Sequence, residues 1–328
     1  MSTKYIGFGK IYIKFLISVL FLSLFYNTAC TSGKNKSVVK DELLYNNTDY
    51  FVIWTHSDIQ PRIKSERKYY KTAIDDINEN FPFIKIALVA GDIIHWSKSP
   101  EVFEWYNSMK KKTSIKYWYE IAGNHDQKDF NNYKKYINKP LHYSVRTGNL
   151  LILCLSDENL KAETEISDKA FKWWKDMVIG NQDKIIITMT HGSLKQSWLM
   201  GTIIPSRNIR NSERFANVLK KYKVDVWLCG HMHLAHSLKG SMRNAPDLNN
   251  TLFINISTIR GNSFKDPESF ILFLKNDSDQ LQIRSRNHSK REFYGYYSKS
   301  FTLSHKFKRD NDAPVMTAMN IPASDAGM

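Results

Sequence analysis

Cysteine is scarce in this sequence. Its 328 residues contain three, Cys30, Cys154 and Cys229. The last two lie in apolar, strand-like runs, LLILCLS and VWLCGH, where a cysteine is usually a buried free thiol. A domain of this length has no need of disulfides even in an oxidising compartment. The cysteine content therefore neither requires export from the cytoplasm nor excludes it.

Long apolar runs are also missing beyond residue 30, where no stretch has the length of a membrane span. Near the start, Lys4, Lys10 and Lys14 accompany an apolar run over residues 15–25, FLISVLFLSLF. This run is too short to cross a bilayer comfortably, but it suits the core of a signal peptide. We expect a signal peptide over residues 1–29 and an exported protein. An uncleaved N-terminal anchor is the alternative, and it would also place the domain outside.

The apolar run leads to Asn27-Thr28-Ala29-Cys30. A cysteine after a small residue resembles a bacterial lipobox, although Asn27 stands where that pattern has Leu, Val or Ile. The resemblance implies a lipid on Cys30 and a protein anchored to a membrane of the cell envelope, in the periplasm or on the cell surface. Residues 30–49 are polar and aperiodic, as expected of a tether.

Acidic residues are fewer than basic ones, 32 against 47, which gives a formal net charge of +15. Such a balance favours anionic partners such as phosphate esters, nucleic acid or an anionic membrane surface. We favour a solvated, lysine-rich surface as the explanation, since runs such as residues 110–112 fall on amphipathic, helix-like segments. The sequence has no recognised nucleic-acid-binding motif, so we expect no nucleic-acid partner. Nothing in it assigns an oligomeric state.

From Tyr50 onward, short apolar runs alternate with amphipathic segments, which predicts an α/β domain with helices covering the sheet faces. We place this domain at residues 50–308. Four segments without helices between them, starting near Ile271, look like strands added antiparallel to one sheet edge. The tail over residues 309–328 is small and polar, and we expect it to be disordered. The expected strands are 51–54, 84–89, 117–121, 150–155, 184–188, 224–228 and 251–256, and the expected helices are 65–80, 100–111, 129–136, 167–178 and 211–222.

Polar side chains follow five of the expected strands, where each strand ends. Because ligands bind at the carboxyl ends of strands in open α/β sheets, these side chains are expected to meet at one edge. Carboxylates, an amide oxygen and imidazoles, with no thiolate among them, suit borderline divalent metals such as Zn, Mn or Fe and argue against a structural zinc cage. The residues stand in the segments Asp58-Ile59-Gln60, Gly91-Asp92, Gly123-Asn124-His125-Asp126, Thr190-His191 and Gly230-His231-Met232-His233.

The order of these five segments resembles the signature of the calcineurin-like metallophosphoesterase superfamily, and it spans residues 58–233. The resemblance implies a four-layer αββα sandwich, two mixed sheets flanked by helices as in metallo-dependent phosphatases. It implies two divalent metal ions, with Asp92 bridging them. The first metal would be held by Asp58, Gln60 and His233, and the second by Asn124, His191 and His231.

The resemblance also implies the reaction, hydrolysis of a phosphomonoester or phosphodiester by a hydroxide that both metals bind. His125 would donate a proton to the leaving oxygen, and Asp126 would orient His125 through a hydrogen bond. One position departs from the family, which usually has His where this chain has Gln60. An amide oxygen is a weaker ligand than imidazole, so we expect the first site to bind its metal less tightly or to prefer a harder ion such as Mn or Mg.

Two other functions remain open from the sequence: a nucleic-acid-binding protein, which has only the charge in its favour, and a binding module. A phosphoesterase-fold binding module with weak or no turnover would usually have lost ligands or the catalytic His, and here His125 and Asp92 are present. Arg62, Arg207 and Arg210 lie near the motifs and are candidates for contacting a substrate phosphate. His95 matches no ligand position, so we leave it out of the site.

Overall fold

The computed structural model describes residues 49–96, 99–158, 160, 164–238, 240–260, 266–295 and 298–320. The expected signal peptide, the lipid site at Cys30 and the tether up to residue 48 lie outside the described residues. Within the described part, none of the helices has the length and apolar character needed to cross a bilayer.

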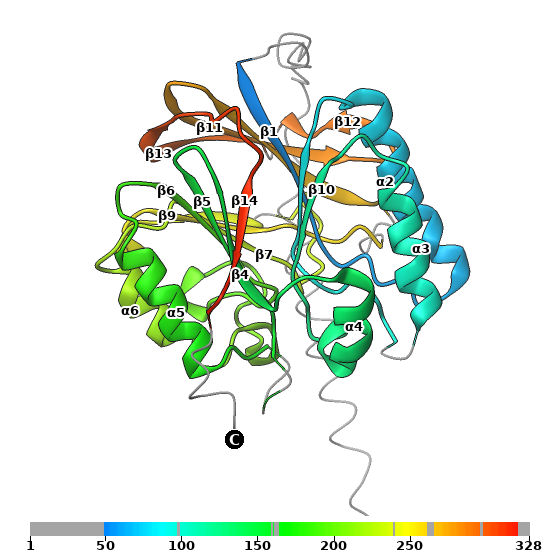
Figure 1. Cartoon of the computed structure of the whole chain (residues 1–328), viewed down its shortest axis with the longest axis horizontal. Coiled ribbons are helices and arrows are strands. Elements are labelled where there is room, and N and C mark those ends of the chain that lie inside the picture. The colour runs from blue at the N-terminus through cyan, green and yellow to red at the C-terminus, as the bar shows by residue number, and fades with distance from the viewer. Residues whose placement is uncertain are drawn as a thin grey trace, which may run out of the picture. The chain divides into compact units, whose positions relative to one another are not determined.

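In the described part of the chain, two seven-stranded mixed sheets pack face to face, and helices cover their outer faces (Figure 1). The expected four-layer sandwich is confirmed. In the first sheet the strand order is β12-β11-β10-β1-β2-β3, with β13 also paired to β11. Its strands are β1 (Tyr50–His56), β2 (Ile86–Val89), β3 (Tyr117–Glu120), β10 (Glu268–Lys275), β11 (Ser278–Asn287), β12 (Glu292–Phe293) and β13 (Lys299–Phe307).

In the second sheet the order is β14-β4-β5-β6-β7-β9-β8. The central strands β5, β6, β7 and β9 run parallel, and antiparallel strands close both edges. The strands are β4 (His142–Thr147), β5 (Leu150–Leu155), β6 (Ile185–Met189), β7 (Val226–Cys229), β8 (Met242–Ala245), β9 (Thr251–Asn255) and β14 (Val315–Ala318).

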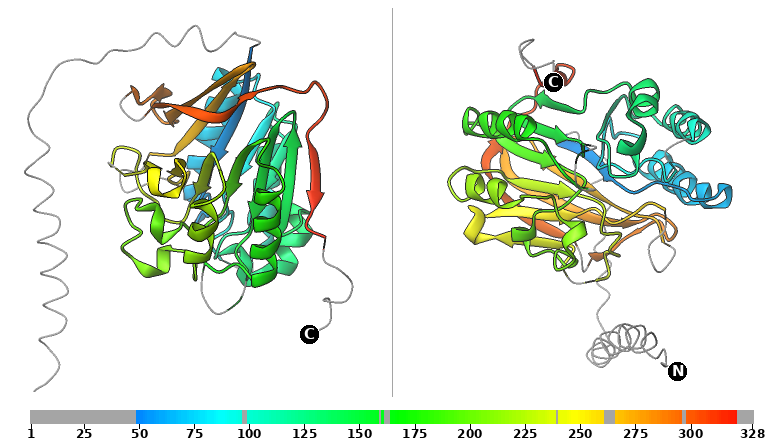
Figure 2. Two further views of the ribbon diagram at one scale, coloured as in Figure 1. Left: turned by 90° about the vertical axis from the view of Figure 1, so that its left-hand side faces the viewer. Right: turned by 90° about the horizontal axis from the view of Figure 1, so that it is seen from below.

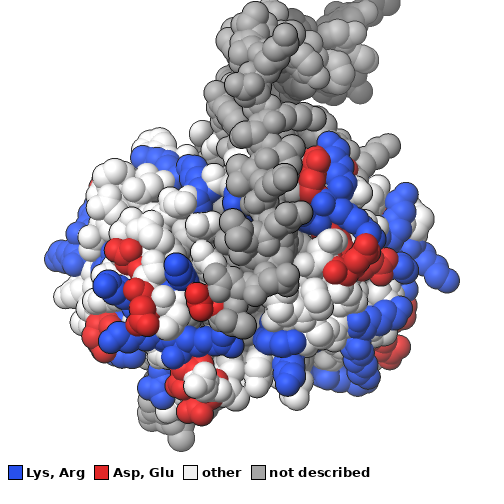
Figure 3. Space-filling view, turned by 90° about the horizontal axis from the view of Figure 1, so that it is seen from above, with Lys and Arg blue, Asp and Glu red and all other residues white. Residues whose placement is uncertain are grey.

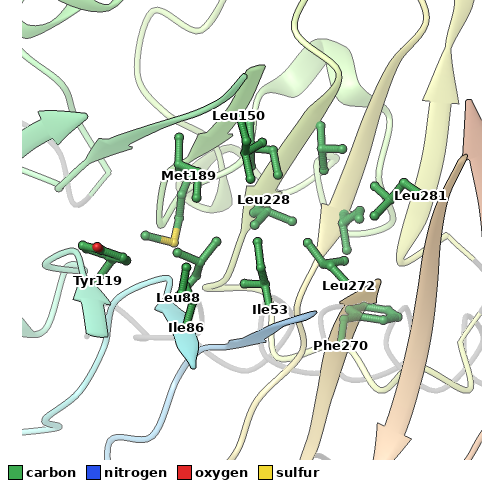
Figure 4. Close-up of a cluster of buried hydrophobic side chains, with 14 of the residues drawn as sticks. Ile53, Ile86, Leu88, Tyr119, Leu150, Met189, Leu228, Phe270, Leu272 and Leu281 are labelled. Carbon is green, nitrogen blue, oxygen red and sulfur yellow. The ribbon is translucent and has the colours of Figure 1, made fainter. Parts of the chain in front are cut away.

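Alternation along the strands separates the central core from the two outer ones. In β5, Leu150, Ile152 and Cys154 face the other sheet, while Leu151 and the later odd-numbered leucines face the helices. Figure 4 shows the central layer, where side chains of both sheets meet. Because both faces of each sheet are covered, these strands are apolar on both sides.

Among the described residues, three α-helices cover the first sheet and two cover the second, on opposite flanks of the sandwich (Figures 1 and 2). Their apolar faces pack against the outward side chains of the strands, for example Trp174 against Trp227. The helices on the first sheet are α2 (Arg67–Asn80), α3 (Pro100–Lys110) and α4 (Phe130–Ile137), and those on the second are α5 (Asp168–Ile179) and α6 (Glu213–Leu219).

A buried ion-pair network ties helix α2 to strand β11. The Asp76 carboxylate accepts hydrogen bonds from Arg286 Nε at 2.9 Å and Nη2 at 2.6 Å, and from His288 Nδ1 at 2.7 Å. Asp76 and His288 are fully buried. Burial favours the neutral acid, but the hydrogen bonds from Arg286 and His288 outweigh it and hold the Asp76 pKa at about 2. This network fixes a helix to the strand pair added at the sheet edge.

The C-terminal region departs from expectation in one place. As expected, β10, β11, β12 and β13 follow one another as antiparallel additions. The tail, however, was expected to be disordered, and for residues 315–318 this is wrong. They form β14, which pairs antiparallel with β4 from Val315 opposite Arg146 to Ala318 opposite Tyr143. The edge of β4 offers unpaired backbone groups, and pairing satisfies them despite the exposed side chains of β14.

Basic side chains do not gather into one continuous patch on the face shown in Figure 3. Over the described part of that face, Lys and Arg lie around the surface with Asp and Glu between them. In the described part of the chain, some lysines pair with acids one helical turn away, as Lys71 does with Asp75 and Lys172 with Asp176. This distribution agrees with a solvated, lysine-rich surface.

Candidate metal centre

Five loops bring the expected ligands to one edge of the sandwich. Three follow strands of the first sheet, β1, β2 and β3, and two follow strands of the second, β6 and β7. Each loop starts where its strand leaves the sheet, so the side chains are delivered by rigid elements. The site is therefore built at the junction of the two sheets.

The ligand atoms form two groups that share one residue. Asp92, His191 and His231 make one group, and Asp58, Asp92 and His233 make the other, with the candidate ligand atoms of each group within 4.8 Å of one another. Asp92 thus occupies the position expected of a bridge. Asn124 belongs with Asp92, His191 and His231, the group expected to hold the second metal, since its Oδ1 lies 3.1 Å from His191 Nε2.

The backbone is held in an unusual conformation at four of these positions. Asp58, Asp92, His231 and His233 have positive φ angles of 54°, 55°, 67° and 52°. Such values cost energy in non-glycine residues and cluster at functional sites. A neighbouring Gly123 explains how the loops fit so closely, because a Cβ at that position would overlap the Asp92 carboxylate.

The second-site histidines present defined nitrogen atoms. His191 Nδ1–H donates to the carbonyl of Ala90 at 2.7 Å, which leaves Nε2 facing Asp92 Oδ2 at 3.3 Å. His231 Nε2–H donates to the carbonyl of Ser206 at 3.1 Å, which leaves its Nδ1 lone pair for a cation. Backbone partners thus fix the orientation of both rings.

The electrostatics of the site favour a cation. Burial opposes ionisation of Asp92, but nearby His191 outweighs it and lowers the pKa of this carboxyl. Burial likewise opposes a charge on His191, yet the Asp92 and Asp58 carboxylates raise its pKa well above the usual value. Burial and the neighbouring His191 lower the pKa of His231 to about 3. Buried, ionised carboxylates beside the neutral imidazole of His231 suit divalent metal ions.

Asp126 does not have the expected partner, and that prediction is wrong. Its buried carboxylate accepts backbone N–H groups of Ile93, Ile94 and Gly123 at 2.9–3.2 Å. The ring of His125 instead donates its Nδ1–H to the carbonyl of His95 at 2.7 Å. Because the Asp126 carboxylate accepts these three backbone N–H groups, it joins the loop after β2 to the loop after β3.

Gln60 faces the ligand group expected of it, through its amide nitrogen. Nε2 donates to Asp92 Oδ2 at 2.8 Å and lies 3.1 Å from His233 Nε2. The amide oxygen lies 2.9 Å from His95 Nδ1. His95 is therefore part of the site, although the only signal for it in the sequence was its place three residues after Asp92.

Among the arginines, the one that reaches the ligands most directly is another residue missed from the sequence. Arg260 Nη2 lies 3.1 Å from His233 Nδ1, and its backbone N–H donates to the Asp58 carbonyl. Arg207 Nη1 donates to the His231 carbonyl at 2.8 Å, which supports the backbone of a ligand. Of the others expected to contact phosphate, Arg62 pairs with Glu66 and Arg210 lies 3.8 Å from Glu165.

Comparison with known proteins agrees with this arrangement. The model of the calcineurin-like phosphoesterase family matches residues 42–235, which contain all five ligand loops. The chain belongs to the calcineurin-like phosphoesterase family. No curated protein matches the sequence.

Two solved structures show the phosphoesterase fold at low sequence identity. A purple acid phosphatase from yellow lupin (Lupinus luteus) seeds is 14% identical, with a TM-score of 0.58 over 78% of this chain and 54% of that one. GAP50 of Plasmodium, the anchor in the inner membrane complex, is 13% identical, with a TM-score of 0.56 over 79% of this chain and 90% of that one. The chain thus spans about half the length of the lupin protein, and the likeness concerns the fold.

The residues present fit the metal site that the family typically carries. Calcineurin-like phosphoesterases typically bind two metals, and this chain places oxygen and imidazole donors in two groups around Asp92. The fit is uneven, since one group has two histidines and the other has one histidine beside the amide of Gln60.

Proposed function

We propose that this chain is a metal-dependent hydrolase that cleaves a phosphomonoester or phosphodiester. The observation that carries the proposal is the pair of ligand groups that share Asp92. Two divalent cations in such a site clamp phosphoryl oxygens and lower the pKa of a water that both contact. Asp58, Asp92, Asn124, His191, His231 and His233 would hold the cations, with Gln60 at the first.

In this proposal His125 acts on the leaving group. Its Nδ1–H is occupied by the His95 carbonyl, so Nε2 is the ring atom that can pass a proton to the leaving oxygen. The ring is half-buried and stacks on His95 with centroids 4.5 Å apart. The backbone N–H of His125 donates to Asp92 Oδ1 at 2.9 Å, which fixes the catalytic loop to the bridging residue.

Hydrolysis of p-nitrophenyl phosphate and bis(p-nitrophenyl) phosphate, with Mn²⁺, Fe²⁺ or Zn²⁺ added, tests the proposal. We expect His125→Ala to reduce kcat by roughly 10²–10⁴-fold on alkyl phosphates. The loss should be smaller with p-nitrophenol, which leaves without help from an acid. His305→Ala is the matched control, since that side chain lies on β13 and contacts the carbonyl of Gln182. Absence of turnover with every metal would favour a binding module.

We also propose that the protein is exported and held at the cell envelope by a lipid on Cys30. The support comes from the basic start, the short apolar run and the cysteine after Ala29. Detergent-phase partitioning of the full chain tests it. Cys30→Ala should move the protein from the membrane fraction to the soluble fraction; a variant that stays in the membrane would indicate an uncleaved anchor instead.

A further inference from the structure

The side-chain amide of Gln60 lies between His95 and the ligand group of the first metal. We call that group, which consists of Asp58, Asp92 and His233, the first group. One end, Nε2, has three atoms of the ligand group around it: Asp92 Oδ2 at 2.8 Å, His233 Nε2 at 3.1 Å and Asp58 Oδ1 at 3.4 Å. The other end, Oε1, lies 2.9 Å from His95 Nδ1. Gln60 is almost fully buried, so each end depends on these partners.

The two ends of an amide have the same shape and opposite chemistry. The NH₂ group donates hydrogen bonds and cannot bind a cation, whereas the carbonyl oxygen accepts hydrogen bonds and can bind one. In this structure the NH₂ group faces Asp58 and Asp92. A cation held by the first group requires the oxygen there, and then the NH₂ group must face His95.

We propose that His95 is a positioning residue that sets which end of Gln60 faces the first metal. This rests on the proposed metal site. A neutral imidazole carries its hydrogen on Nδ1 or on Nε2. With the hydrogen on Nδ1, His95 donates to Gln60 Oε1 and turns the NH₂ group inward. With it on Nε2, Nδ1 accepts from the NH₂ group and turns the oxygen toward the ligands.

His95 also contacts the proposed proton donor. Its carbonyl accepts Nδ1–H of His125 at 2.7 Å, and its ring stacks on the His125 ring at an interplanar angle of 26°. On its other side, the indole of Trp96 meets the His95 ring edge-on at 4.5 Å. The ring is thus fixed by its neighbours, and one residue connects the amide at the first metal with the group at the leaving oxygen.

Metal binding by the full chain tests this without turnover. Metal-free protein is titrated with Zn²⁺ by calorimetry, and Gln60→Ala identifies which dissociation constant belongs to the first site. Three replacements change the partner of Gln60: His95→Asp can only accept, His95→Phe keeps a ring and does neither, and His95→Asn is a neutral side chain that can do both. Each is made with Gln60 and with Gln60→Ala, and thermal melts check folding.

We expect His95→Asp, which can only accept from the NH₂ group, to tighten the first site by about tenfold, and His95→Phe, which loses one hydrogen bond whichever end of the amide faces it, to stay within about threefold of the wild type. His95→Asn should stay within about threefold of the wild type. With Gln60→Ala, the Asp effect should shrink to that of its charge, because the amide that it orients is gone. Equal effects in both backgrounds, or no metal at the first site of the wild type, would overturn the inference.

Nitrogen NMR of the histidine side chains gives a second readout. Adding Zn²⁺ should move the His95 hydrogen from Nδ1 to Nε2, and an Nδ1 that keeps its hydrogen in the metal-bound protein would contradict the inference. Failure of the proposed function looks different. If His95 and Gln60 prove coupled in metal binding while no phosphoester is hydrolysed, the inference stands and the hydrolase proposal fails.

Discussion

Replacing Asp126 with Asn separates two roles for a residue next to the proposed proton donor. The carboxylate accepts three backbone N–H groups, two from the loop after β2 and one from Gly123. Asn has the same size but only one accepting oxygen. If that oxygen keeps the bonds to Ile93 and Ile94, the new NH₂ group faces the N–H of Gly123, and two donors point at each other.

The cost follows from the hydrogen bonds lost. One bond to a buried carboxylate disappears, and one buried N–H is left without an acceptor, which together amount to about 2–4 kcal/mol. For a domain of this size, that lowers Tm by roughly 4–7 °C. Because Gly123 precedes Asn124 and the other loop carries Asp92, we also expect both metals to bind at least about tenfold more weakly.

Thermal melts and metal titrations measure these effects, and Asp129→Asn is the matched control. Asp129 lies on the same segment and caps helix α4 by accepting the N–H of Asn132 at 3.1 Å. Asn caps helices as well as Asp does, so the control should change neither Tm nor metal affinity. If Asp126→Asn lowers kcat alone and leaves stability and metal binding intact, the carboxylate acts on His125 and our reasoning is refuted.

Further predictions concern the first site, the buried network and the tail. Gln60→His should tighten Zn²⁺ binding at the first site by about tenfold or more, because imidazole is the better ligand; unchanged affinity in a titration would contradict this. Asp76→Asn should cost about 3–5 kcal/mol in urea unfolding, since it leaves Arg286 buried without its partner, while kcat is retained. In the wild type, the folded pKa of Asp76 lies below its unfolded value, so its contribution of about 2 kcal/mol is present above about pH 4 and is lost as the pH falls toward about 2, as acid unfolding would show. Ending the chain before Val315 should change stability by about 1 kcal/mol or less but promote association through the bared edge of β4, visible by size-exclusion chromatography.

The sequence predicted the strands and helices that bury apolar side chains on a regular period. Strand β5 is apolar at every position, and helix α5 buries Ala170, Trp174 and Val178 at helical spacing. The missed strands are those with mixed side chains. Strand β4 reads HYSVRT, β8 reads MRNA and β14 is exposed throughout. Their place is set by the backbone groups of a neighbouring strand, and the pattern of their own side chains does not record it.

The grouping of the candidate ligands could be predicted because each one follows a strand in a short, restrictive motif. The hydrogen bonds around them could not. Asp126 follows His125 directly, which suggested a bond between the two side chains, yet the turn after β3 points the carboxylate at the amides of a different loop. Neighbours in sequence are a poor guide where the chain turns sharply, because successive side chains then point in different directions.

The asymmetry at Gln60 shows the same limit at the centre of the site. From the sequence, Gln60 is a weak ligand that replaces a stronger one, and the first metal is simply bound less well. In the folded chain, 35 residues separate Gln60 from the His95 ring that its amide contacts. A histidine in place of Gln60 would have no carbonyl oxygen to engage that ring. The weaker binding that we expect at the first site and the histidine beside the amide are therefore linked in our proposal, since an amide that can face either way gives the neighbouring ring control over the ligand.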